Sequence, residues 1–83
     1  MHQQISVLGI DIAKRGFHVV GMNERGQIVL RKRLSRHALM SFLAPLPPVL
    51  IGMEADGGAH CWARRFHEHG HEVKLMAPQF VKP

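Results

Sequence analysis

The sequence predicts one α/β domain in which two helices pack against a mixed five-stranded sheet. Three observations support this fold class. Short runs rich in Ile, Val and Leu recur at the length of strands. Two longer segments carry apolar residues at helical spacing. The chain has 83 residues, which is enough for one domain with a modest core.

Three strands joined by two tight turns open the chain. We expect the strands at residues 4–12, 17–22 and 27–34. Lys14-Arg15-Gly16 forms the first turn, and Asn23-Glu24-Arg25-Gly26 forms the second, because Asn and Gly tolerate positive φ. The third strand alternates, with Ile28, Leu30 and Leu34 on one face and Gln27, Arg31 and Arg33 on the other. These features predict an antiparallel meander with one solvent-exposed face.

Two helices alternate with two further strands in the rest of the chain. Ser35 is a good N-cap for a helix at residues 36–44, which three prolines then end. A strand at 49–55 leads to a helix at 59–69, for which Gly70 is the natural C′ residue. A fifth strand covers 72–77, and residues 78–83 begin an element that the chain does not complete.

This order of elements determines the sheet topology. Parallel neighbours need a crossover, and crossovers are right-handed. The helix at 36–44 can therefore return the fourth strand to lie beside the first, with the fifth strand beyond it. The predicted sheet order is 3-2-1-4-5, which is a ribonuclease H-like architecture.

Two carboxylates close two of the predicted strands. Asp11 follows one apolar run and Glu54 another, each with glycine two residues before it, at Gly9 and Gly52. In the predicted sheet both acids lie at the carboxyl ends of neighbouring parallel strands, where α/β sheets place ligands. Like charges this close favour a shared divalent cation. We therefore predict that Asp11 and Glu54 bind a shared Mg²⁺ or Mn²⁺.

Each of these acids also has an ordinary structural interpretation. Asp11 can accept amide hydrogen bonds in a turn, and Glu54 can pair with an arginine on the surface. Asp56 is either a third metal ligand or the N-cap of the following helix, and the cap is the preferred interpretation.

The chain is basic, with a formal net charge of +5 and a pI near 10.4. Such a balance favours an anionic partner, most often nucleic acid. Two groups of cations are candidates for phosphate contacts: Lys14 and Arg15 beside Asp11, and the cluster Arg31, Lys32, Arg33 and Arg36. The cluster could equally protect an exposed sheet edge, and the first pair could form salt bridges with Asp11.

The histidines and the tryptophan favour structural roles. His60, His67, His69 and His71 lie near Cys61, but no Cys-x-x-Cys pair accompanies them, which disfavours a zinc site. The spacing of Trp62 matches an apolar helix face, so we expect it in the core rather than on a base-stacking surface.

The remaining composition favours a cytoplasmic protein. Cys61 is the single cysteine, so no internal disulfide can form. No segment reaches the roughly 18 apolar residues of a membrane span, and the N-terminus lacks signal-peptide features.

Taken together, these segments resemble the beginning of the DEDD transposases of bacterial insertion sequences, whose catalytic domain is RuvC-like. The resemblance covers nearly the whole chain, and the combination of motifs is more specific than any one of them. The matching stretches are Gly9-Ile10-Asp11-Ile12-Ala13-Lys14, Gly52-Met53-Glu54-Ala55 with Gly57-Gly58, Trp62-Ala63-Arg64, Gly70-His71-Glu72-Val73 and Ala77-Pro78-Gln79-Phe80-Val81.

The resemblance implies that Asp11 and Glu54 are the first two acids of a catalytic tetrad. Residues 1–83 would then be the N-terminal portion of the domain, ending before the last two aspartates and inactive by itself. Asp56 departs from the family, in which a small uncharged or hydroxyl residue is usual, so its influence on metal binding stays open.

The activity that the resemblance implies is DNA recombination. Carboxylate-bound metal ions polarise a phosphodiester and orient the attacking oxygen during cleavage and strand transfer. The implied partners are DNA and a structured guide RNA. We also expect a homo-oligomer for the full-length protein, since the edge of the fifth strand invites self-association.

Two other functions compete with this one. The chain could be a non-catalytic, basic module that binds nucleic acid. It could also be a fragment of an actin-like or sugar-kinase-like ATPase, which shares the strand order. Such ATPases place Gly and Ser/Thr after the first aspartate to cradle phosphate, whereas here Ile12-Ala13-Lys14-Arg15 follows. The ATPase is therefore the least favoured function.

Overall fold

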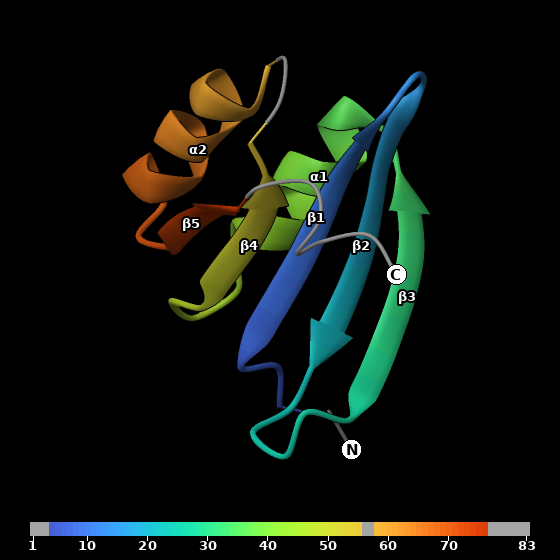
Figure 1. Cartoon of the computed structure of the whole chain (residues 1–83), viewed down its shortest axis with the longest axis vertical. Coiled ribbons are helices and arrows are strands. Elements are labelled where there is room, and N and C mark those ends of the chain that lie inside the picture. The colour runs from blue at the N-terminus through green and yellow to red at the C-terminus, as the bar shows by residue number, and fades with distance from the viewer. Residues whose placement is uncertain (1–3, 56–57, 77–83) are drawn as a thin grey trace.

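The computed structural model describes residues 4–55 and 58–76, and within them the backbone forms one sheet and two helices (Figure 1). The meander consists of β1 (Val7–Ala13), β2 (Gly16–Met22) and β3 (Ile28–Leu34). After it come α1 (Arg36–Leu43), β4 (Leu50–Glu54), α2 (Ala59–Glu68) and β5 (Glu72–Met76). None of the described helices is long and apolar enough to cross a membrane.

The sheet order is β3-β2-β1-β4-β5, which confirms the predicted topology. β1 and β3 are antiparallel to β2, whereas β1, β4 and β5 run parallel to one another. Gly9 lies opposite Gly52 in the parallel pairing of β1 with β4. The second half of the sheet therefore has the geometry that follows from two helical crossovers.

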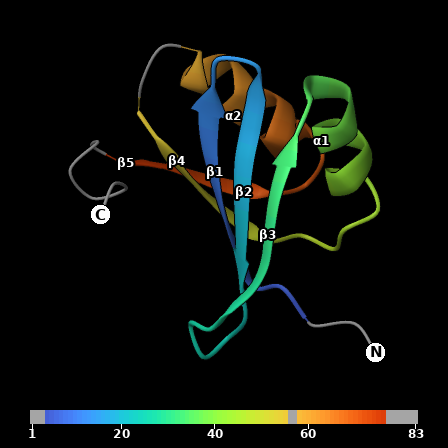
Figure 2. The same ribbon diagram turned by 90° about the vertical axis from the view of Figure 1, so that its right-hand side faces the viewer.

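Both helices cover the same face of the sheet (Figure 2). Alternate strand residues bury their side chains against the helices and form one core. This core is completed by Leu39 and Leu43 of α1 and by Ala59 and Phe66 of α2. The buried strand residues are Leu8, Ile10, Phe17, Val19, Ile51 and Met53. Residues of the other parity therefore lie on the opposite face, called here the open face, which neither α1 nor α2 covers.

The β2–β3 turn forms through a side chain rather than through the backbone freedom predicted for Asn23. Asn23 Oδ1 accepts hydrogen bonds from the backbone N–H groups of Arg25 and Gln27, at 2.9 and 3.0 Å. Among the described residues, positive φ occurs only at glycines, and here it is Gly26 that has φ +78°. The prediction of a turn is confirmed: Gly26 supplies the positive φ, and Asn23 contributes as a hydrogen-bond acceptor.

The helix termini follow the predicted signals. Ser35 Oγ accepts a hydrogen bond from the backbone N–H of Ala38 at 3.2 Å, which caps α1. Gly70 has φ +92° directly after α2 and its C-cap, and its backbone N–H donates to the carbonyl of His67 at 2.9 Å. The capping role considered for Asp56 and the element expected at residues 78–83 lie outside the described residues.

Two details of the strands differ from the prediction. β1 begins at Val7 rather than at residue 4 and continues to Ala13. The register of β2 and β3 shifts between Gly21 and Met22, so Gly21 pairs with Leu30 but Met22 pairs with Ile28. Ile28 therefore does not share the face of Leu30, and it is 49% exposed. The alternation predicted for β3 was therefore wrong at Ile28, because an irregular strand end adds a residue to one side of the ladder.

Candidate carboxylate site and basic surfaces

The two predicted acids lie on adjacent strands and on the same face of the sheet. Asp11 follows Ile10 and Glu54 follows Met53, and Ile10 and Met53 are register partners in the parallel pairing of β1 with β4. Both acids have the opposite parity to the buried core residues, so both belong to the open face. Since neighbouring strands lie roughly 5 Å apart, the two carboxylates start from adjacent positions.

The environments of the two acids differ. Asp11 is exposed and lies within β1, with Ile12 and Ala13 still in the strand after it. Glu54 ends β4, the strand between β1 and β5, and is only 8% exposed. The expectation that both acids close a strand therefore holds for Glu54 but not for Asp11. The reason is that the hairpin with β2 extends β1 to Ala13, opposite Gly16.

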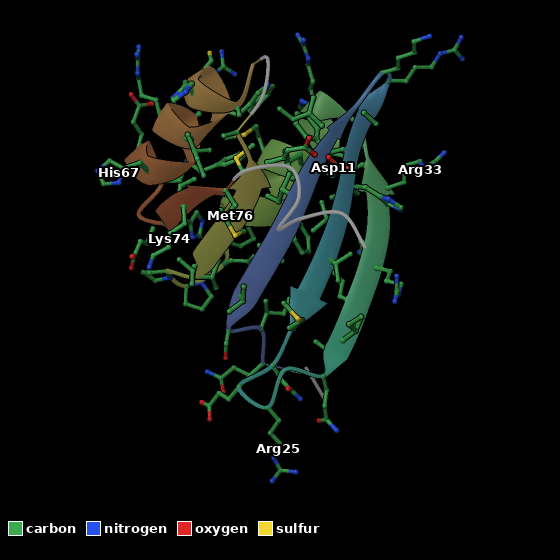
Figure 3. The ribbon with its side chains drawn as sticks, viewed as in Figure 1. Asp11, Arg25, Arg33, His67, Lys74 and Met76 are labelled. Atoms are coloured by element: carbon green, nitrogen blue, oxygen red, sulfur yellow. The ribbon has the colours of Figure 1, made fainter. Side chains whose placement is uncertain are left out.

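Beside the acids, the described residues leave the sheet surface less crowded at Gly9 than at Gly52. A Cβ atom placed on Gly9 would meet, among the described residues, only the carbonyl oxygen of Val20 at 3.9 Å. A Cβ atom on Gly52 would lie 2.8 Å from Cε of Met76. Figure 3 shows Met76 beside β4, and its register partner there is Glu54. Among the described residues, the less crowded part of this face is therefore the one above Gly9.

A histidine and an arginine continue the row of polar residues across the sheet. His18 on β2 is the register partner of Asp11, and Arg33 on β3 is the register partner of His18. Figure 3 shows Asp11 and Arg33 on strands that lie on either side of β2. Sequence reasoning did not single out His18, because a lone histidine in an apolar run carries no motif. Only the hairpin register could have revealed it.

The structure separates the predicted basic cluster into two surfaces. Arg31 and Arg33 have the parity of the open face, whereas Lys32 lies on the helix-covered side, with Nζ 5.5 Å from the ring centroid of Phe42. Arg36 belongs to α1, and its guanidinium lies over the ring of Trp62 at 5.9 Å. The four cations therefore do not form one patch, because alternate residues of a strand point to opposite faces.

Lys14 and Arg15 occupy the turn between β1 and β2, and both are exposed. This turn follows Ala13, so the two cations lie at the same end of the sheet as Asp11. Of the six predicted phosphate contacts, Arg33 is the one in the same register row as Asp11. Arg31 lies two residues away along the sheet, opposite Val20, and Lys14 and Arg15 follow Asp11 by three and four residues.

The histidines do not form a common site in the described part of the chain. His71 is buried and acts within the fold: its Nδ1 accepts a hydrogen bond from the backbone N–H of Val49 at 3.2 Å. Its Nε2 lies 3.4 Å from the carbonyl oxygen of Leu43. His60, His67 and His69 are exposed on or just after α2. Within residues 4–55 and 58–76, no group of three or more His, Cys, Asp or Glu side chains is arranged to hold a metal ion.

Trp62 lies against the core, as its spacing predicted. Its ring meets Phe17 edge-on, with centroids 4.8 Å apart, and Phe66 at 5.9 Å. The guanidinium groups of Arg36 and Arg65 also lie over the indole ring, and Trp62 is half-buried.

Comparisons with known proteins connect this chain to transposases. It is 48% identical over 79 residues to a probable family 20 transposase of Pseudomonas aeruginosa, covering 95% of this chain and 23% of that protein. It is 46% identical over 79 residues to the transposase for insertion sequence element IS1328 of Yersinia enterocolitica, covering 95% of this chain and 24% of that protein. The IS1111A transposase of Coxiella burnetii is 40% identical over 81 residues, which are 98% of this chain and 22% of that protein. No family model matches the chain.

These similarities extend over nearly the whole chain, yet the chain spans less than a quarter of the length of each of these relatives. Nearly every residue described above, including Asp11 and Glu54 on the open face, therefore lies in a segment that is similar to part of a transposase of an insertion sequence.

Proposed function

We propose that this chain is the N-terminal portion of a RuvC-like DEDD transposase domain with a ribonuclease H-like sheet. In this proposal Asp11 and Glu54 contribute to a site for Mg²⁺ or Mn²⁺ that serves phosphodiester cleavage and strand transfer on DNA. The observation that carries the proposal is the placement of both acids at adjacent positions of parallel strands, on one face of the sheet. The 40–48% identity to proteins named transposases supports the same function.

The residues present fit a hard divalent cation. Mg²⁺ and Mn²⁺ prefer carboxylate oxygens, and two carboxylates with water ligands are a usual protein contribution. Among the described residues, a Cβ atom on Gly9 would meet only the carbonyl oxygen of Val20, so the sheet beside Asp11 is not crowded there. When bound, such an ion polarises the scissile phosphodiester and stabilises the charge that develops on it.

The chain's own residues have distinct roles in this proposal. Asp11 is exposed and can meet an incoming phosphate and its counter-ion, whereas buried Glu54 is held between β1 and β5. Lys14, Arg15 and Arg33 lie at the same end of the sheet and would neutralise phosphates of the substrate strand. Two acids are half of a DEDD tetrad, so the chain by itself is expected to bind the ion weakly and to leave DNA intact.

The proposal is tested by titrating the chain with Mn²⁺ and following the free ion by electron paramagnetic resonance. The variants Asp11→Asn and Glu54→Gln keep side-chain size and remove one charge each. We expect each to weaken Mn²⁺ binding by roughly ten-fold or more. Glu24→Gln, in the exposed β2–β3 turn, is the matched control and should leave the affinity unchanged. Equal Mn²⁺ affinity in the wild type and all three variants would contradict the metal site.

Catalysis itself is tested in a chimera. The chain replaces the matching segment of the IS1328 transposase of Yersinia enterocolitica, to which it is 46% identical. Asp11→Asn should then abolish transposition that the unsubstituted chimera supports, while DNA binding persists. The full-length protein would act on DNA, associate with a structured guide RNA and form a homo-oligomer, as the resemblance implies.

A second function is favoured by the net charge of +5 and by cations on both faces of the sheet. In this alternative the chain is a non-catalytic module that binds nucleic acid. It predicts that Asp11→Asn leaves transposition by the chimera intact, which distinguishes it from the metal-dependent function.

A further inference from the structure

A pocket of about 440 Å³ is lined by residues of the two helices, which cover the face of the sheet opposite to the one that Asp11 belongs to. Residues of α1 form one wall and residues of α2 the other: Arg36, His37, Met40, Cys61, Trp62 and Arg65. In the part of the chain that the structure describes, no acidic side chain lines it. The pocket therefore combines an indole with two guanidinium groups and an imidazole.

Both arginines of this pocket lie over the same indole ring. The guanidinium carbon of Arg65 is 5.1 Å from the centroid of Trp62, and that of Arg36 is 5.9 Å away. The indole ring also packs against the rings of Phe17 and Phe66. A cation over an aromatic ring is held by the negative potential of the ring face. Trp62 thus positions two charged groups that come from different helices.

Arginines held in this way are suited to bind phosphate. A guanidinium carries five N–H donors at its planar edge, and contact with a ring face leaves that edge available. Two such groups, with no carboxylate among the described residues that line the pocket, match a phosphate that offers several acceptor oxygens. An uncharged or cationic ligand would leave this charge uncompensated, so charge complementarity favours an anion.

We propose that Arg36 and Arg65, positioned by Trp62, form a second phosphate-binding site that contacts the backbone of a nucleic acid on the helix side of the sheet. The sequence grouped Arg36 with the cations of β3, but the structure groups it with Arg65 of α2. The site does not depend on the metal site, and rests on the proposed function only in taking nucleic acid as the partner. A strand held here lies on the opposite side of the sheet from a substrate at Asp11.

The proposal is tested by measuring the affinity of the chain for fluorescein-labelled oligonucleotides by anisotropy over a range of salt concentrations. Three probes of the same sequence separate the possible sources of phosphate: single-stranded DNA, duplex DNA and a hairpin RNA. The variants are Arg36→Gln, Arg65→Gln and the two combined. Arg25→Gln is the matched control, because Arg25 is exposed in the β2–β3 turn at the far end of the molecule (Figure 3).

At about 0.1 M salt, one lost phosphate contact lowers affinity by roughly five- to ten-fold and reduces the slope of log K against log salt by about 0.7–0.9. We expect each single variant, Arg36→Gln or Arg65→Gln, to show this loss of affinity and this reduction in slope. The double variant should reduce the slope by about twice as much as either single variant. Arg25→Gln should change affinity less than about three-fold, since it alters only the net charge. The assay contains no divalent ion, so its outcome does not depend on the metal site, which the Mn²⁺ titration tests separately.

Fluorescence supplies a second, independent measurement. Trp62 is the only tryptophan of the chain, so its emission reports directly on the groups that touch it. Binding of an unlabelled oligonucleotide should change this emission in the wild type and in Arg25→Gln, but not in the double variant. The proposal is wrong if the double variant keeps wild-type affinity and salt slope, if Arg25→Gln loses as much affinity as either single variant, or if saturating nucleic acid leaves the Trp62 emission unchanged.

Discussion

Replacing His71 by leucine tests how the two halves of the fold are held together. His71 is 1% exposed and lies just before β5. Its Nδ1 accepts a hydrogen bond from the backbone N–H of Val49, and its Nε2 faces the carbonyl oxygen of Leu43. One side chain thereby links the end of α1, the entry to β4 and the entry to β5.

The size of the effect follows from what leucine leaves behind. Leucine fills nearly the same volume, so His71→Leu creates no large cavity. The backbone N–H of Val49, itself 6% exposed, loses its acceptor, and an unsatisfied buried donor costs about 1–3 kcal/mol. The bond to Leu43 is long at 3.4 Å and adds little. We therefore expect a loss of about 2 kcal/mol, a large part of the roughly 4–12 kcal/mol typical of a domain of this size.

The loss of unfolding free energy is measured by urea titration, with Trp62 fluorescence as the signal. Trp62 reports on unfolding because it packs against Phe17 and Phe66. His67→Leu, on the exposed side of α2, is the matched control and should change the unfolding free energy by less than about 0.5 kcal/mol. His71→Asn restores an acceptor near Nδ1 and should recover part of the loss. The reasoning is refuted if His71→Leu unfolds within about 0.5 kcal/mol of the wild type, or if His67→Leu costs as much.

Three further stability predictions use the same assay. Gly16→Ala should cost about 2 kcal/mol or more, because Gly16 has φ +151° and its added Cβ would lie 2.5 Å from the backbone carbonyl oxygen of Leu34; a loss below about 0.5 kcal/mol contradicts this. Gly52→Ala should cost less than about 1 kcal/mol, since the flexible end of Met76 can move aside; a larger loss would show a rigid contact. Asn23→Ala should cost about 1 kcal/mol, because two backbone donors lose their acceptor, and an unchanged urea midpoint would disprove it.

The sequence allowed most of the fold to be predicted, for reasons that are local. The Ser35 cap, the proline-rich segment after α1 and the Gly70 terminus each act on neighbouring backbone groups, so their signals can be read along the chain. Sheet order followed from the handedness of crossovers and the length of the connections. The start of β1 and the irregularity near Met22 were missed, because strand ends depend on which partner strand is present.

The candidate site was predictable in part. Asp11 and Glu54 could be placed together because both follow a Gly-x-acid spacing, which the pairing of Gly9 with Gly52 confirms. Their unequal exposure was not predictable, since it depends on the neighbours of each strand. His18 was missed for the same reason: only the hairpin register brings it opposite Asp11.

By itself, the sequence determined the elements, their order in the sheet and the face on which the two acids lie, because periodicity and turn chemistry act over a few residues. Tertiary structure alone decided which cations act together. It brought Arg36 of α1 and Arg65 of α2 to one indole ring. Such groupings depend on contacts between elements far apart along the chain, and no local pattern encodes them.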